Sequence, residues 1–256
     1  MEGFKYNLYA ETVDKLKDGV EEGGLQFIGQ KVMEEARIKP VYKLEEAEPT
    51  IFEQSRQKLN TEAGIIIANH PGYYDTFPIL NALERKDVKI VVSEANYKSF
   101  ASVGDEYIIK ASNDPKEAVS FLKAIKDHIE NGGVVLIYPT GGRDRVDKNS
   151  EDEQFVFEDG LSVILRKCLR PNDMVYSFYV EPEDIKPLVN ESIPRTAGVV
   201  SAVNYNLPNI NKLKETSEIR VNERYSKALE WQETIAGLER EDKNRALERH
   251  FIEGIN

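Results

Sequence analysis

The sequence contains a single cysteine, Cys168, and only three histidines in 256 residues. One cysteine cannot form an intramolecular disulfide or the Cys-rich ligand set of a structural zinc site. Long apolar runs are also missing. The most apolar stretches, residues 64–68 and 134–138, have the length of strands, whereas a membrane-spanning helix needs ~20 apolar residues. The N-terminal residues lack the apolar run of a signal peptide. We therefore expect a cytoplasmic protein, or a protein of the plastid stroma if a transit peptide was removed.

Positive charge is in short supply. The chain has 34 Lys and Arg against 45 Asp and Glu, which gives a formal net charge of −11. A nucleic-acid-binding protein needs a broad basic face, so the composition argues against nucleic acid as a partner. It also disfavours general adhesion to anionic membranes, and we expect at most peripheral membrane contact. A small basic pocket within an acidic protein remains compatible with these numbers.

Several catalytic signatures are absent as well. The sequence has no Gly-x-x-x-x-Gly-Lys-Ser/Thr loop, which disfavours nucleotide hydrolysis. The segment around Ser162 lacks the second glycine of a nucleophile elbow, which disfavours a serine hydrolase of that type. A His-Glu-x-x-His pair is missing too, and nothing else in the sequence predicts a metal site.

What the chain does contain is a regular alternation of strand-like and helix-like segments. Short apolar runs predict strands at residues 65–67, 88–92, 106–110, 134–138 and 174–180. Segments of helical periodicity lie between them, including residues 114–131 and 158–169. Such alternation predicts an α/β fold with a mixed, largely parallel sheet flanked by helices.

The two ends of the chain differ from this pattern. Residues 1–45 have helical spacing and predict a small N-terminal helical region, which ends at the polar segment 45–49. Residues 46–256 would then form the main α/β domain. From Glu218 onward, scattered apolar residues among many charges predict a charged helical tail.

The first loop that carries chemistry is residues 68–75, which directly follows a predicted buried strand. It contains His70 and Asp75, and α/β sheets place ligand-binding groups at this end of their strands. On a regular helix the five-residue separation would put the two side chains on different faces, but Pro71 and Gly72 favour a turn. A carboxylate beside an imidazole makes the imidazole a general base for a hydroxyl group. The alternative is an ordinary turn histidine and a helix-capping aspartate.

The second loop, residues 139–145, follows another predicted buried strand. Gly141 and Gly142 allow the backbone to approach a ligand closely. Arg143 and Arg145 can clamp a phosphate with paired hydrogen bonds. The alternative is a surface turn whose arginines pair with neighbouring aspartates.

Together the two loops resemble those of the glycerolipid acyltransferase family. That family has an Asn-His-x-x-x-x-Asp block, matched by Asn69, His70 and Asp75. Residues 139–145 are similar to the Pro-Ser-Gly-Gly-Arg-Asp-Arg version found in the soluble glycerol-3-phosphate acyltransferases of plastids. Thr140 departs from the glutamate that is usual elsewhere in the family.

Weaker matches extend the resemblance to roughly residues 60–205. Gly104 and Lys110 resemble a family block in which a glycine is followed six residues later by a basic phosphate-binding residue, commonly arginine. Residues 196–201 resemble a Gly-rich strand of the plastid enzymes. Lysine is a point charge rather than a planar fork, so the departure at Lys110 bears on the identity of the substrate.

The resemblance implies transfer of a fatty acyl chain from acyl-CoA or acyl carrier protein to the hydroxyl of glycerol 3-phosphate, in phospholipid biosynthesis. His70 would be the general base and Asp75 its partner. The acceptor phosphate would be held by the basic and glycine residues Lys110, Gly141, Gly142, Arg143 and Arg145. No cofactor other than the acyl donor is implied.

Other functions stay open at this point. The acceptor could be lysophosphatidate or a non-phosphorylated alcohol or amine. The chain could instead be a non-catalytic module that binds acyl thioesters or lipids, or a phosphate-dependent binding module with no lipid ligand. Turnover separates the enzymes from both kinds of module.

Overall fold

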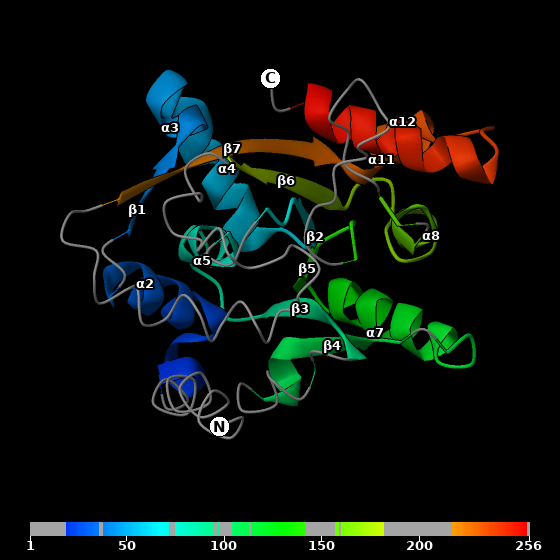
Figure 1. The fold of residues 1–256 in the computed structure, drawn as a ribbon, viewed down its shortest axis with the longest axis horizontal. Helices are drawn as coiled ribbons and strands as arrows, with labels where there is room; N and C mark the ends of the chain where they lie inside the picture. The colour runs from blue at the N-terminus through cyan, green and yellow to red at the C-terminus, as the bar shows by residue number, and fades with distance from the viewer. Residues whose placement is uncertain are drawn as a thin grey trace, which may run out of the picture.

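The computed structural model describes residues 19–35, 38–71, 75–94, 97, 104–112, 114–141, 157–158, 160–181 and 217–254. Within these residues the strands form one seven-stranded sheet in the order β1-β7-β6-β2-β5-β3-β4 (Figure 1). The strands are β1 Ile38–Tyr42, β2 Gly64–Ala68, β3 Val88–Ser93, β4 Ile108–Ala111, β5 Val134–Ile137, β6 Met174–Val180 and β7 Ser217–Lys227.

Strands β6, β2, β5, β3 and β4 are parallel to one another. Strand β7 pairs antiparallel with β6, and β1 pairs parallel with β7. The prediction of a mixed, largely parallel sheet is therefore confirmed.

Helices cover both faces of the sheet (Figure 1). One face packs against α2 Leu25–Glu35, α3 Lys43–Ala47, α4 Pro49–Thr61 and α5 Thr76–Asn81. The other face packs against α7 Ala118–Glu130, α8 Gly160–Lys167, α11 Ala228–Thr234 and α12 Arg240–Glu253. A short 3₁₀ helix, η2 Asp105–Tyr107, leads into β4. None of the helices in the described residues is both long and apolar enough to span a bilayer.

The middle of the sheet is closed to water from both sides. Every residue of β2 and β5 is buried, as expected for parallel strands covered by helices on both faces. Gly64 opens β2 at a point where a Cβ atom would lie 2.0 Å from the carbonyl oxygen of Met174. Only glycine allows β2 to approach β6 this closely.

Two expectations for the chain ends are corrected. Residues 1–45 were expected to be helical. Leu25–Glu35 is indeed a helix, but Ile38–Tyr42 is a strand that joins the sheet beside β7. The apolar pattern around Pro40 is too short to distinguish the two periodicities. The division into domains at residue 45 stays a prediction.

The C-terminal tail was expected to be helical from Glu218. Helices α11 and α12 are present, but Ser217–Lys227 is an eleven-residue strand. Its inward positions alternate with outward ones, and Ile219, Val221 and Glu223 are buried. A buried glutamate in this series concealed the apolar alternation that marks a strand.

Candidate active site

The two loops that carry chemistry follow neighbouring parallel strands. Ile67 in β2 lies opposite Ile137 in β5. The carboxyl ends of both strands therefore reach the same edge of the sheet, with His70 following β2 and Tyr138 following β5. This is the edge at which open α/β sheets bind ligands.

Asn69 ends the pairing between β2 and β6. Its side-chain Nδ2 donates to the carbonyl oxygen of Val180 at 2.8 Å, and the backbone N–H of Val180 donates to its Oδ1 at 2.7 Å. The side chain is almost fully buried. It replaces one rung of backbone hydrogen bonding, so both groups of Val180 stay paired. The main chain can then leave the sheet immediately, at His70.

His70 and Asp75 lie in direct contact. The imidazole Nδ1 is 2.7 Å from Asp75 Oδ2. The Asp75 side chain is completely buried, and the His70 side chain is 16% exposed. Because an ionised carboxylate only accepts hydrogen bonds, Nδ1 carries the proton in this pairing, and Nε2 is then the basic nitrogen. The arrangement is that of an imidazole oriented by a buried acid.

The sequence patterns alone give no role to the neighbours of this pair, Tyr138 and Thr76. The Tyr138 ring stacks on the His70 ring with centroids 4.5 Å apart and planes inclined by 29°. Its hydroxyl lies 2.6 Å from Thr76 Oγ1, which in turn lies 3.3 Å from Asp75 Oδ1. The position of Tyr138 at the end of a predicted strand could have suggested a role. The sequence does not give the order of the strands in the sheet, however, so it could not show that Tyr138 lies beside His70.

The Gly-rich loop begins with a tight turn. Gly141 has φ +66° and its N–H donates to the carbonyl oxygen of Tyr138 at 3.1 Å. A left-handed residue at this place favours glycine. The backbone N–H of Glu158 donates to the carbonyl oxygen of Pro139 at 2.7 Å, which ties Glu158 to the start of the loop. The remaining predicted members of this loop, Gly142, Arg143 and Arg145, lie outside the described residues.

A family profile described as Acyltransferase matches residues 50–182. This range begins in α4, contains β2 to β6 and includes both loops. The chain belongs to the acyltransferase family. The resemblance drawn from the two loops is thereby confirmed at the level of the family, while the similarity to plastid enzymes in particular stays a prediction.

A solved structure supports the fold of this acyltransferase. The 1-acyl-sn-glycerophosphate (LPA) acyltransferase PlsC from Thermotoga maritima superposes with a TM-score of 0.50 at 13% sequence identity. The superposition covers 90% of this chain and 77% of that chain. A comparison with curated protein sequences gave no match.

In this acyltransferase Lys110 lies near the carboxyl end of its strand, as His70 does, but on a different strand. It is in β4, which is separated from β2 by β5 and β3. Three strand spacings correspond to about 14 Å. Its Nζ is 3.2 Å from Glu94 and 3.8 Å from Glu117, and the hydrogen bond with Glu94 raises its pKa. The role of Lys110 in phosphate binding stays a prediction.

Cys168 is not suited to act as the nucleophile of the acyltransferase. It is buried at the end of α8, where its Sγ lies 3.4 Å from the carbonyl oxygen of Leu122. Burial raises the pKa of its thiol to about 11. The reactive thiolate would therefore be scarce at neutral pH.

Proposed function

We propose that this acyltransferase transfers a fatty acyl chain from a thioester, acyl-CoA or acyl carrier protein, to the hydroxyl of glycerol 3-phosphate, with His70 as general base. The observation that carries the proposal is the 2.7 Å contact between His70 Nδ1 and the buried carboxylate of Asp75. This contact fixes the tautomer in which Nε2 can accept a proton.

The chemical step follows from this geometry. Nε2 of His70 takes the proton of the acceptor hydroxyl while the hydroxyl oxygen attacks the thioester carbonyl. The resulting imidazolium is stabilised by the Asp75 carboxylate. When the carbon–sulfur bond breaks, the proton passes from His70 to the leaving thiolate. The products are an ester and a free thiol.

Holding the acceptor beside His70 is the other requirement of this reaction. We assign the phosphate to Arg143 and Arg145, together with the backbone of Gly141 and Gly142, and to Lys110 on the flank. Support comes from the likeness of residues 139–145 to the soluble plastid enzymes. In keeping with a water-soluble acceptor, we place the reaction in the cytoplasm or the plastid stroma.

A second acceptor, lysophosphatidate, is favoured by the similarity in fold to the Thermotoga maritima enzyme, which acts on 1-acyl-sn-glycerophosphate. Lysophosphatidate offers the same phosphate and a free hydroxyl, but it already carries one acyl chain. The two acceptors therefore differ in the apolar contact they require and not in the chemistry at His70.

The test is thiol release from palmitoyl-CoA by the purified protein. We expect release that depends on glycerol 3-phosphate and is lost by at least about 10³-fold in His70→Ala. His128→Gln is the matched control. His128 lies at the opposite edge of the sheet, where its Nε2 contacts the carbonyl oxygen of Asp87 at 2.9 Å. This variant should retain full activity.

Each other outcome has a distinct meaning. Release with lysophosphatidate alone would make it the acceptor and leave the role of His70 intact. Release by His70→Ala at the wild-type rate would refute the general-base assignment. If the protein binds palmitoyl-CoA but releases no thiol, either from palmitoyl-CoA or from an acylated carrier protein, it is a non-catalytic lipid-binding module.

A further inference from the structure

A short series of hydroxyl groups links the second loop to the buried acid of the first. The Tyr138 hydroxyl lies 2.6 Å from Thr76 Oγ1, and Thr76 Oγ1 lies 3.3 Å from Asp75 Oδ1. The other oxygen of the same carboxylate, Oδ2, faces His70. The two oxygens of Asp75 therefore have different partners, one on each side.

The direction of each hydrogen bond follows from the donors available. An ionised carboxylate can only accept, so Thr76 donates its single hydroxyl hydrogen to Oδ1. Thr76 then has no hydrogen left for Tyr138, so Tyr138 is the donor in the 2.6 Å contact. The hydrogen bonds run in one direction, from Tyr138 to Thr76 to Asp75.

This direction matters because the carboxylate of an aspartate rotates easily. Its terminal torsion is broad and roughly two-fold, so the side chain alone does not fix which way the oxygens point. A donor on Oδ1 restricts that rotation and keeps Oδ2 toward the imidazole.

We propose that Thr76 and Tyr138 are positioning residues, which hold Asp75 in the orientation that presents Oδ2 to His70. Tyr138 acts twice, through its hydroxyl on Thr76 and through its ring, which packs against one face of the imidazole at 4.5 Å. The consequence for catalysis rests on the proposed function of His70. The consequence for the geometry of the pair does not.

The test uses variants that remove one hydroxyl at a time. Thr76→Val keeps the shape and removes the donor, Thr76→Ser keeps the donor, and Tyr138→Phe keeps the stacked ring. We expect Thr76→Val to lower kcat about tenfold with KM little changed, and Thr76→Ser to retain most of the activity. Tyr138→Phe should lower kcat about threefold, the loss of one hydrogen bond that acts indirectly.

The double variant gives the sharpest result. If the Tyr138 hydroxyl acts only through Thr76, then Tyr138→Phe has no further effect on kcat in the Thr76→Val protein. Independent, multiplicative losses would contradict the series. The acidic limb of the pH profile of kcat/KM should also move to lower pH in Thr76→Val, because an imidazolium without a fixed carboxylate is less stable.

A second measurement needs no turnover. The sequence has three histidines, so the ring resonances of His70 can be identified by comparison with His70→Ala and followed by NMR as the pH is varied. We expect the titration midpoint of His70 to fall in Thr76→Val and to stay at the wild-type value in Thr76→Ser. An unchanged midpoint together with an unchanged kcat would overturn the proposal.

The two proposals can fail separately. If His70→Ala keeps its turnover while Thr76→Val shifts the titration of His70, the positioning role stands and the general-base role is wrong. If His70→Ala is inactive while Thr76→Val and Tyr138→Phe match the wild type in both measurements, the general base stands and the positioning role is wrong. Should Thr76→Val not fold, the same comparison is made with Tyr138→Phe.

Discussion

The two ends of the parallel strands, called here the amino edge and the carboxyl edge of the sheet, are built differently. At the amino edge, where β2, β3, β5 and β6 begin, charged side chains are tied to carboxylates and backbone carbonyls. At the carboxyl edge a histidine, an aspartate and two hydroxyl groups contact one another beside the Gly-rich loop. Among the described residues, the contacts where the strands begin join parts of the protein to one another, whereas those at the carboxyl ends include the pair to which we assign the chemistry.

Arg85 makes the largest number of the polar contacts described here at the amino edge. Its guanidinium donates to both oxygens of Asp87 at 2.7 Å and to the carbonyl oxygens of Leu59, Glu62 and Gly132 at 3.0, 2.6 and 2.5 Å. One nearly buried side chain thus joins the end of α4 to the starts of β3 and β5. Planar geometry with five donors suits arginine for this purpose.

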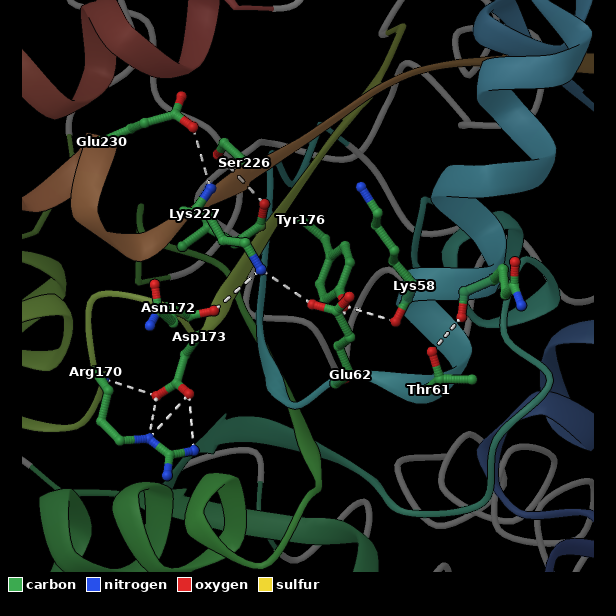
Figure 2. Close-up of polar contacts among 12 residues, drawn as sticks. Lys58, Thr61, Glu62, Arg170, Asn172, Asp173, Tyr176, Ser226, Lys227 and Glu230 are labelled. Carbon is green, nitrogen blue, oxygen red and sulfur yellow. Dashed lines mark hydrogen bonds and ion pairs between the residues drawn. The ribbon is translucent and has the colours of Figure 1, made fainter.

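A second set of contacts lies at the starts of β2 and β6, as Figure 2 shows. Lys227 Nζ lies 3.2 Å from both the Glu62 carboxylate and the carbonyl oxygen of Asn172. Arg170 pairs with Asp173 at 2.9 Å. These groups satisfy one another within the protein, so this edge is expected to contribute to stability and not to the reaction.

The largest expected change in stability involves Glu223, which affects stability although it lies toward the carboxyl ends of the strands. It is a buried acid in β7 opposite Phe178, toward the carboxyl half of the sheet. Among the described residues no hydrogen bond of good geometry reaches either of its oxygens, and only the nearby Tyr225 hydroxyl, which lowers its pKa slightly, approaches it. Burial raises its pKa from the ordinary value of 4.5 to about 8, and nearby Glu45 acts in the same direction while Arg56 opposes it.

Folded protein therefore keeps a proton on Glu223 between pH 4.5 and about 8, where the unfolded chain has lost it. The contribution of this protonation to the free energy of unfolding is fully present below pH 4.5 and is lost as the pH rises from 4.5 to about 8. Relative to Glu223→Gln, we expect the wild type to lose roughly 4 kcal/mol of unfolding free energy from pH 4 to pH 9. Urea denaturation across this range measures the difference. Parallel curves for the two proteins would show that Glu223 does not titrate in this way.

Arg85→Ala sharpens the comparison at the amino edge. Removing the guanidinium leaves Asp87 and three backbone carbonyls without their donor, and we expect the unfolding free energy to fall by about 3 kcal/mol. Arg85→Lys should lose about half of this because it keeps the charge but not the fork. The kcat/KM of the remaining folded protein should be unchanged. A loss of kcat/KM in stable protein would mean that the two edges are coupled.

The smallest effect is expected at Lys227. Its side chain and that of Glu62 are 45% and 39% exposed, and exposed ion pairs contribute about 0–1 kcal/mol. Lys227→Ala should lower the melting temperature by no more than a few degrees, and added salt should reduce the difference. A loss as large as that of Arg85→Ala would show that Lys227 fixes the start of β6 as firmly.

Much of the fold could be predicted from the sequence because its centre is apolar and periodic. The runs at Ile65–Ile67 and Val134–Ile137 have the length and the β-branched composition of strands, and both are buried strands. The pairing of His70 with Asp75 could be anticipated because two turn residues lie between them. These signals are local, so no tertiary structure was needed to see them.

The missed features depend on contacts between distant parts of the chain. Ser217–Lys227 is a strand because it pairs with β6 and β1, while Glu223 and its charged neighbours suggest a helix. Thr76 and Tyr138 are 62 residues apart and meet only because β2 and β5 are adjacent. The order of the strands also places β5 and β3 between the strand of Lys110 and β2, and the role of Lys110 stays a prediction.

Asn69 has a consequence for any attempt to transplant this site. Its amide pairs with Val180 as a backbone unit would, which requires one donor and one acceptor at the length of an asparagine side chain. Aspartate lacks the donor and glutamine is one carbon longer. A designer who grafts the histidine and aspartate onto another parallel sheet must therefore also provide this asparagine and a neighbouring strand that extends two residues further, as Val180 does beyond Phe178. Without them, the main chain would leave the sheet at a different position and the imidazole would be misplaced.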